Sequence, residues 1–330
     1  MQKTHLRECI TTDLQRRNNK KMNMNRTILV ATIFLSLVAH AQKKVPSKTY
    51  NLHSEFKYQV EISSMDIIGN TMFVLSESCE YLYQFNIDSL NDSRENIPSM
   101  KVHLPFLGGS DVEGLALFDH YVFYINEDGN SIKSFDLETL KPVAIKPNKI
   151  KLPKNNSSYR LYTGLEGIDI NSELSILYVI QERDKKQETS ISRLLAYRIG
   201  RKNNEFVLTY LDELEISLEH DFRYSSIALS EDYNSIFLIR SKFIKRSNKG
   251  EYFIDKIDFE STSMFSNSKI DMSKIKHFQI DNNKINNANI EGMAHFNNTL
   301  YIINDNLESA SKNCYKSINK PTYIFTFKDK

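Results

Sequence analysis

The sequence lacks the motifs that mark the common enzyme classes. It has no Gly-x-Ser-x-Gly nucleophile elbow, no His-Glu-x-x-His metal motif, no phosphate-binding glycine-rich loop and no Cys/His spacing suited to zinc. The pair Gly108-Gly109 is more typical of a turn than of a phosphate cradle. No segment after residue 41 has the period of a long helix. These absences argue against a nucleophile-elbow hydrolase, a P-loop protein and a helical fold.

A strong excess of one charge is also lacking once the N-terminal segment is set aside. Arg26 precedes an apolar run, residues 27–38, which ends in Ala39-His40-Ala41. This is the pattern of a secretory signal peptide, and the run is too short for a membrane span. We expect residues 1–41 to be an N-terminal extension and signal peptide, cleaved near Ala41-Gln42, and residues 42–330 to be periplasmic or secreted. That product has 36 basic and 39 acidic residues, a net charge of about −3, which argues against a nucleic-acid partner.

A five-residue pattern recurs along the chain, and its spacing indicates the fold. Three copies are clear, at Glu113–Leu117, Glu166–Ile170 and Glu291–His295, and each begins Glu-Gly-aliphatic. Two degenerate copies begin at Ser63 and Ser225. The copies are 50 to 66 residues apart, and several short strands follow each one. Such a repeat predicts an all-β fold, a β-propeller, that occupies residues 42–330 as one domain.

Each repeat predicts one four-stranded blade. The third, for example, reads as strands Gly167–Ile170, Ile176–Gln181, Leu194–Ile199 and Glu205–Leu211. The last repeat supplies three strands before the chain ends, so an N-terminal strand at Tyr50–Tyr58 is expected to close the ring. The count is five blades, and a sixth stays open within the irregular stretches 200–221 and 258–289.

Cysteine is scarce, with three in 330 residues. Cys9 leaves with the targeting segment, and no cysteine follows the cleavage site to carry a lipid anchor. Cys79 and Cys314 each follow the second strand of a repeat, the first and the last, which are neighbours in a closed ring. In an oxidising compartment a disulfide between them is expected, and two unpaired thiols are the alternative.

Acidic residues recur at the first residue of a copy and at the end of the second strand. Because these two points lie side by side in an antiparallel hairpin, the residues should meet at one rim of the ring. The predicted rim acids are Glu77, Glu113, Glu127, Glu166, Glu182, Glu291 and Asp305. Arg240 is the one cation counted in register with them.

Close carboxylates raise one another's pKa or recruit a cation, and oxygen ligands suit Ca²⁺. We therefore expect a calcium site, with Glu113, Glu166, Glu291 and Asp305 as ligands. The alternative is structural: each glutamate accepts hydrogen bonds from backbone amides of the next blade and fixes the packing between blades.

The order of these copies resembles the phytase-like propeller family, which is described as having esterase-like activity of phytase. The resemblance runs through most of residues 54–328 and rests on Ile62–Met65, Asp111–Ala116, Gly164–Ile168 and Asn289–Ala294. Similar Glu-Gly-aliphatic repeats occur in the SdiA-regulated propellers, which are the close alternative. The resemblance implies a secreted propeller with esterase or phosphoesterase activity and Ca²⁺ dependence.

The sequence departs from the family pattern at two places. Ser64 stands where a glycine is expected, and Ile239 stands where an acid precedes the arginine. The first change concerns structure, whereas the second removes a carboxylate from the rim.

Two functions from different classes follow. One is a hydrolase of a small ester or phosphate ester, in which Glu166 is a metal ligand and Arg240 orients the substrate. The other is a non-catalytic module whose rim binds a glycan, a peptide or a protein at the surface. The acidity of the rim favours the binding module, or an enzyme that holds more than one metal ion.

Overall fold

The computed structural model describes the following parts of the chain: residues 42–52, 62–76, 79–108, 112–126, 129–150, 164–183, 190–219, 221–244, 249–259, 269–270, 273, 275–285, 289–305 and 321–329. The chain divides into two compact units, residues 1–42 and 43–330, and the second contains nearly all of these residues. The described residues form strands, turns and two 3₁₀ helices, η1 (Ile87–Ser89) and η2 (Pro105–Leu107). No helix among them is long and apolar enough to cross a membrane.

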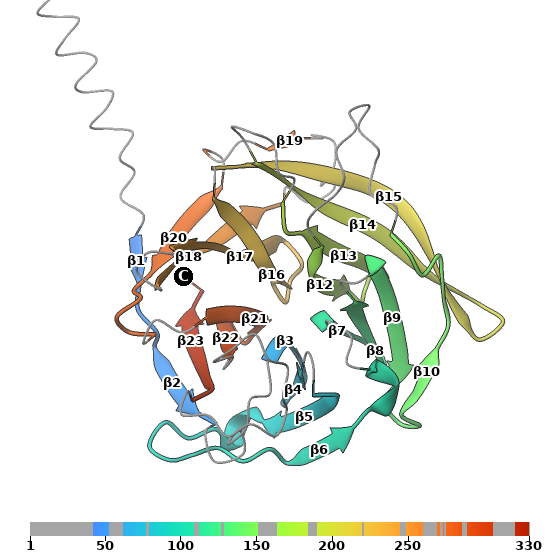
Figure 1. Ribbon diagram of the computed structural model, residues 1–330, viewed down its shortest axis with the longest axis horizontal. Coiled ribbons are helices and arrows are strands. Elements are labelled where there is room, and N and C mark those ends of the chain that lie inside the picture. Colours follow the sequence, from blue (N-terminus) through green and yellow to red (C-terminus); the bar gives the residue numbers. More distant parts are fainter. Residues whose placement is uncertain are drawn as a thin grey trace, which may run out of the picture. The chain divides into compact units, whose positions relative to one another are not determined.

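Five sheets surround a common axis, so the structure is a five-bladed β-propeller, as the repeat predicts (Figure 1). The first blade consists of β3 (Ile62–Ile68), β4 (Thr71–Ser76), β5 (Tyr81–Asn86) and β6 (Met100–His103). The second consists of β7 (Val112–Phe118), β8 (Tyr121–Asn126), β9 (Ser131–Asp136) and β10 (Lys141–Val143). In each blade the first strand lies innermost, and successive strands are antiparallel.

The third and fourth blades carry extra strands. The third consists of β12 (Leu165–Asn171), β13 (Ile176–Gln181), β14 (Ser190–Lys202) and β15 (Glu205–Leu218), with the short strands β11 (Ile145–Lys146) and β19 (Lys269–Ile270) parallel to β15. The fourth consists of β16 (Phe222–Leu229), β17 (Ser235–Ile244), β18 (Lys249–Asp258), β20 (Lys276–Ile280) and β1 (Gln42–Lys44).

The fifth blade closes the ring with an N-terminal strand. It consists of β21 (Asn289–Phe296), β22 (Thr299–Asp305), β23 (Tyr323–Lys328) and β2 (Lys48–Asn51). Because β2 supplies the outermost strand, the first and last parts of the propeller are held together by a ladder of backbone hydrogen bonds. The closure is confirmed, although β2 begins two residues before the predicted strand; residues 53–60 lie outside the described part.

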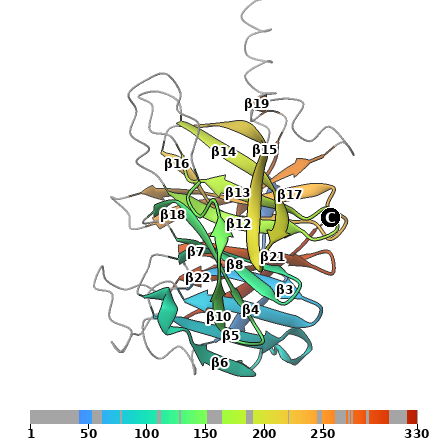
Figure 2. The same cartoon turned by 90° about the vertical axis from the view of Figure 1, so that its right-hand side faces the viewer.

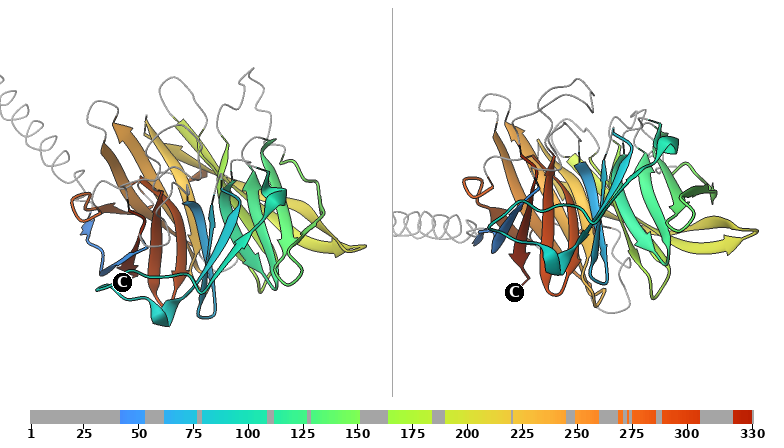
Figure 3. Two further views of the ribbon diagram at one scale, coloured as in Figure 1. Left: turned by 60° about the horizontal axis from the view of Figure 1, so that its bottom comes forward. Right: turned by 90° about the horizontal axis from the view of Figure 1, so that it is seen from below.

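The β14–β15 hairpin is much longer than its predicted strands. Ser190 to Lys202 pairs with Glu205 to Leu218, with a register shift at Ala196/Tyr197. The stretch 200–221 is therefore mostly an extension of the third blade rather than a sixth blade. The hairpin projects beyond its neighbours in Figure 3, and in Figure 2 the same side of the ring faces the viewer, with β15 in the middle of the picture.

The core consists of five hydrophobic clusters, one at each junction between neighbouring blades. Between the second and third blades, for instance, Phe123 and Ile125 pack with Ile168, Leu195 and Phe206, all of them buried. Alternate residues of each sheet point to opposite faces, so every blade contributes to two clusters. The apolar residues thus stack the sheets face to face and leave the strand ends free to carry polar groups.

Candidate functional site

Each inner strand has a β-bulge at the first residue of the repeated pattern. The register with the second strand shifts there in all five blades, and the bulged residues are Ser63, Glu113, Glu166, Ser225 and Glu291. A bulge leaves one residue outside the ladder and re-aims its side chain. The inner strands contact one another in the cyclic order β3, β7, β12, β16, β21. The five bulges therefore define one rim of the ring, as the sequence predicts, and we call it the bulge rim.

The two serines at the bulge rim connect neighbouring blades. Ser63 Oγ donates a hydrogen bond to the carbonyl of Val112, the residue before the next bulge. Ser225 Oγ donates in the same way to the carbonyl of Ile290, at 3.4 Å. Both hydroxyls are buried, so each bond satisfies a polar group that water does not reach. In the two degenerate copies the first residue is thus structural.

The residue after the bulge needs to be small in the clear copies. A Cβ at Gly167 would lie 2.9 Å from the backbone nitrogen of Ile227 on the next inner strand, and one at Gly114 would lie 3.0 Å from that of Ile168. Backbone atoms cannot move aside as the end of a flexible side chain can. A glycine is therefore needed at this position because neighbouring inner strands approach closely at the bulge rim.

Arg223, at the start of β16, is the cation that lies among the rim acids. Its Nη1 donates to Glu182 Oε1 at 3.3 Å, and its Nη2 lies 4.0 Å from Glu291 Oε1. Burial alone would lower the pKa of this guanidinium, but the carboxylates of Glu166, Glu291 and Glu182 raise the pKa overall. The Arg223 side chain is 35% exposed, so a ligand can reach it from solvent.

The carboxylates around Arg223 differ in exposure. Glu166 is buried, and the side chains of Glu182 and Glu291 are 14% and 16% exposed. Glu291 also accepts a 2.6 Å hydrogen bond from Asn289 Nδ2. Asp305 is buried and belongs to the same group, because Glu291, Arg223 and Asp305 all act on the hydroxyl of Tyr252.

Burial and then the charge of Glu291 raise the pKa of Tyr252 to about 12. Three carboxylates thus act on the Arg223 guanidinium, and with Asp305 the set has a formal charge of −3. We call this set, Glu166, Glu182, Arg223, Glu291 and Asp305, the Arg223 cluster.

Hydrogen bonds to the backbone on both sides of Arg223 hold it in place. The amide of Tyr224 donates to the carbonyl of Glu182 at 3.2 Å, and Arg183 Nη1 donates to the carbonyl of Phe222 at 3.4 Å. The third and fourth blades are therefore clamped together next to the guanidinium, which fixes its position before any ligand arrives.

Arg240 is not at the bulge rim. It pairs with Tyr224 across the hairpin, whereas Arg223 pairs with Ser241, just as Asn289 pairs with Asp305. Ser241 is thus the fourth blade's counterpart of the rim acids, and Arg240 is one residue out of register. A shift of one residue in a strand moves the side chain to the opposite face.

On that face Arg240 is part of a buried polar group within the fourth blade. Its Nε donates to Asp255 Oδ2 at 2.7 Å, and Tyr224 Oη donates to the same oxygen at 3.0 Å. His277 Nδ1 lies 2.7 Å from Asp255 Oδ1, and the guanidinium packs 4.3 Å from the ring centre of Phe253. The expected role of Arg240 in orienting a substrate stays a prediction; in the structure its guanidinium is paired with Asp255 inside the blade.

The other predicted site residues are placed only in part. Glu113 is half-buried at the bulge of β7. Glu77, Glu127 and Cys314 lie outside the described residues. Cys79, which is buried and follows β4, is disulfide-bonded; because its partner lies outside the described residues, the pairing with Cys314 stays a prediction.

The calcium ion expected from the sequence does not fit the Arg223 cluster. Arg223 lies between carboxylates that would have to bind the ion, and a guanidinium repels a second cation there. Among the described residues, no three His, Cys, Asp or Glu side chains are arranged so that they could hold a metal ion. Calcium therefore stays a prediction that depends on groups outside the described ranges, such as Glu77 and Glu127.

Two aspartates make bonds of the kind that the structural alternative expects of the glutamates, and for the glutamates themselves that alternative stays a prediction. Asp66 Oδ2 accepts the amide of Leu117 on the next blade at 2.7 Å, and Asp169 Oδ2 accepts the amide of Leu229 at 2.6 Å. Both aspartates stand three residues after their bulge, where the other blades have alanine. They lie toward the opposite end of the inner strands, so they do not belong to the Arg223 cluster.

The sequence of this chain matches the profile of a known family. The profile of the phytase-like family, described as esterase-like activity of phytase, matches residues 43–306. The chain belongs to this family. No curated protein sequence matches it.

Two solved structures align with this chain at low similarity. The glutaminyl cyclase of Myxococcus xanthus aligns over 86% of this chain and 95% of its own, with 10% identity and a TM-score of 0.44. A chain of a nidogen/laminin complex aligns over 74% of this chain and 73% of its own, with 8% identity and a TM-score of 0.36. At these scores neither similarity supports an argument about function.

Proposed function

We propose that this phytase-like propeller hydrolyses esters at the Arg223 cluster. The observation that carries the proposal is a partly exposed guanidinium held among carboxylates at the bulge rim. Such an arrangement places a donor for a developing oxyanion beside groups that can take a proton. The family membership supports ester hydrolysis as the reaction class.

Arg223 would stabilise charge on the ester oxygen. Its planar N–H donors stay protonated at any working pH, because the surrounding acids raise its pKa further. Preorganised donors aimed at a developing oxyanion are worth roughly 10²–10³ in rate when one is removed. The clamp on both sides of Arg223 supplies the preorganisation.

Glu166 would act as the general base that activates water. It is the most buried glutamate of the cluster, and it projects from a bulge beside the guanidinium. A positioned base contributes roughly 10²–10⁴ in rate. Glu182 and Glu291 hold Arg223 by charge, so their part is positioning.

The charge of the cluster favours an uncharged carboxylic ester over a phosphate ester. Even when the neighbouring Arg183 is counted with Arg223, the four carboxylates outnumber the two guanidinium groups and repel a phosphate dianion, whereas a neutral ester enters without that penalty. A phosphate ester, including phytate, would need added cations to neutralise the rim. Calcium dependence is therefore proposed for phosphate esters only.

The test is hydrolysis of p-nitrophenyl butyrate, p-nitrophenyl phosphate and phytate by the purified protein, with Ca²⁺ and with EDTA. We expect turnover of the carboxylic ester in both buffers. Glu166→Gln and Arg223→Gln should each lower kcat/KM roughly 10²-fold. Glu138→Gln and Arg198→Gln, both at exposed positions, are the matched controls and should leave it unchanged.

Two outcomes decide between the proposals. Turnover of phosphate esters alone, lost in EDTA, would replace the carboxylic-ester proposal with a calcium-dependent phosphoesterase. No turnover by folded protein in either buffer would favour a binding module for a glycan, peptide or protein. Export is proposed as well, and N-terminal sequencing of the protein recovered outside the cytoplasm should find Gln42 first.

A further inference from the structure

A cavity lies at the end of the ring opposite to the bulge rim. It has a volume of about 280 Å³, and all five inner strands contribute to its lining. The lining residues that matter most are Asp66, Asp169, Leu229, Glu231 and His295. They stand near the C-terminal ends of the inner strands, whereas the bulges stand near the N-terminal ends. The cavity is therefore separate from the Arg223 cluster.

The charged groups of this cavity are acidic. Asp66 comes from β3, Asp169 from β12 and Glu231 from the turn after β16, and no lysine or arginine is among the described residues that line it. Each oxygen of the two aspartates already accepts one backbone amide. A carboxylate oxygen can accept more than one hydrogen bond, so both groups retain acceptor capacity toward the cavity.

His295 supplies the second, independent observation. Its side chain is 2% exposed and lines the cavity, yet neither ring nitrogen has a hydrogen-bond partner among the described residues. The ring stacks on Phe237 at 5.2 Å and 9°, which fixes its plane. Burying an imidazole without hydrogen-bond partners costs free energy unless a ligand or a water molecule forms hydrogen bonds with the ring nitrogens.

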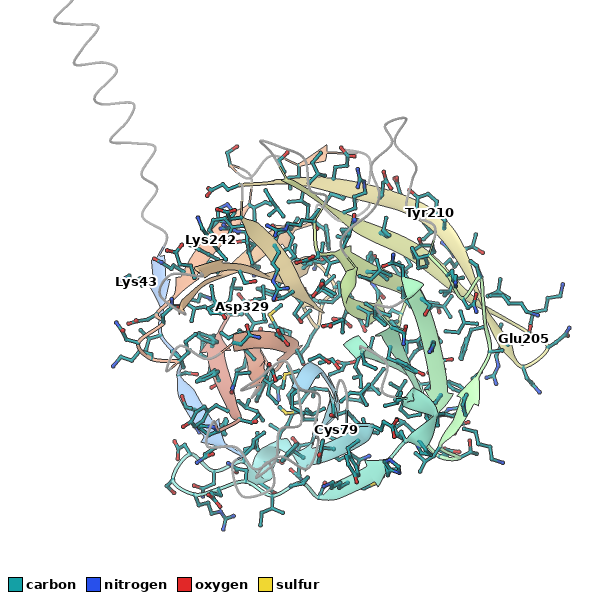
Figure 4. All side chains as sticks on the ribbon, in the orientation of Figure 1. Lys43, Cys79, Glu205, Tyr210, Lys242 and Asp329 are labelled. Atoms are coloured by element: carbon teal, nitrogen blue, oxygen red, sulfur yellow. The ribbon has the colours of Figure 1, made fainter. Side chains whose placement is uncertain are left out.

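The surroundings keep His295 neutral. Burial lowers its pKa, and Asp329, whose Oδ2 is 3.8 Å from Nε2, offsets this only in part. Asp329 is itself bound by Lys256 Nζ at 3.1 Å, so its charge is shared (Figure 4 labels Asp329 beside the fifth blade). A neutral imidazole has one donor nitrogen and one acceptor nitrogen, and this ring lines the cavity.

We propose that this cavity binds a small organic ammonium ion with a short aliphatic stem. The carboxylates of Asp66 and Asp169 supply the charge complement, and His295 accepts or donates a hydrogen bond. Leu117, Ile170 and Leu229 supply the apolar wall for the stem. A volume of 280 Å³ suits a molecule of a few heavy atoms. An anion is disfavoured because no cationic side chain of the described lining faces it.

Binding should strengthen with pH. Burial raises the pKa of Asp169 to about 7, and burial together with Asp169 raises that of Asp66. The other titratable groups near them are Glu231, Tyr233 and His295 in the cavity lining and Tyr178, which pairs with Asp169 on the neighbouring strand. Because a cation needs the ionised carboxylate, affinity should fall below pH 7 as Asp169 takes up a proton.

The test is calorimetric titration of the purified protein with n-butylammonium and with its neutral analogue 1-butanol. At pH 8 we expect one butylammonium per chain and at least roughly tenfold weaker binding of butanol, because the charge pair is lost. At pH 6 the affinity for butylammonium should drop several-fold. Asp169→Asn should weaken binding at least roughly tenfold, whereas Asp212→Asn, at a half-buried position of β15 outside the cavity lining, should not.

A measurement on the unmodified chain guards against a misfolded variant. The ¹⁵N resonances of the His295 ring should shift when butylammonium saturates the cavity. Equal affinity for butanol, or equal loss in Asp212→Asn and Asp169→Asn, would overturn the proposal. Absence of both heat and a His295 shift at tens of millimolar ligand would show that the cavity holds water only.

Discussion

Replacing Gly167 by alanine tests whether the inner strands approach as closely as the structure shows. The new Cβ would lie 2.9 Å from both the backbone nitrogen and Cγ2 of Ile227, and 3.0 Å from Cγ2 of Ile180. Ordinary contact begins near 3.4 Å, so β12 and β16 would have to separate by about half an ångström. Overpacking of this kind costs about 1–3 kcal/mol.

A second term acts in the opposite direction. Alanine restricts the unfolded chain and thereby stabilises a protein by about 0.4–1 kcal/mol where the folded backbone accepts it. For Gly167→Ala the net loss of unfolding free energy should therefore be about 1–2 kcal/mol. For Gly200→Ala, where the Cβ meets only the carbonyl oxygen of Val207 at 3.6 Å, the unfolding free energy should stay equal or rise.

The assay is urea unfolding followed by far-UV circular dichroism and by tyrosine fluorescence. We expect the midpoint to fall for Gly167→Ala and to hold or rise for Gly200→Ala, with an unchanged slope. Equal midpoints for the two variants would refute the reasoning, because only the Cβ at residue 167 is expected to push neighbouring strands apart. That result would mean that the inner strands have room to separate at the bulge rim.

Three further predictions concern charge and covalent structure. Between pH 4 and pH 7 the stability of Asp169→Asn relative to the unaltered protein should rise by a few kcal/mol. The pKa of Asp169 is about 7 in the folded state and about 3.9 in the unfolded state, so the aspartate destabilises the folded state increasingly as the pH rises. Urea titrations across that pH range measure the difference. Asp255→Ala should cost about 3–5 kcal/mol in the same assay, because it leaves Arg240 buried without its partner; a loss below 1 kcal/mol would contradict the pairing. Non-reducing peptide mapping should find Cys79 joined to Cys314, and a bond to Cys9 would refute that pairing.

The fold could be predicted from the sequence because the same local requirement is met once per blade. Each inner strand needs a bulge residue followed by a small one, and the close approach of Gly167 to Ile227 shows why. That requirement recurs in the sequence as the Glu-Gly-aliphatic pattern. The extent of β14 and β15 could not be predicted in the same way, because residues 211–218 extend a hairpin past the blade and carry no repeat.

The residues of the rim could be predicted only where the assumed pairing of the first and second strands of a blade was correct. Counting from the first residue of the fourth copy placed Arg240 with Glu182 and Asp305, but the ladder pairs Ser241 with the rim position. The other blades have Ser76, Asn126, Gln181 and Asn304 at the position of Arg240, and all of these side chains are buried. An error of one residue thus exchanged a rim group for a group inside the blade.

A signal for Arg223 was nevertheless present. The fourth blade is the one whose rim positions carry no acid, Ser225 and Ser241, and Arg223 lies two residues before its bulge. Acids contributed by the third and fifth blades converge on this gap, so a cation there is the arrangement that lowers their repulsion. The rim is therefore asymmetric. The fourth blade has serines where other blades have acids, and this blade supplies Arg223, on which the proposed chemistry depends.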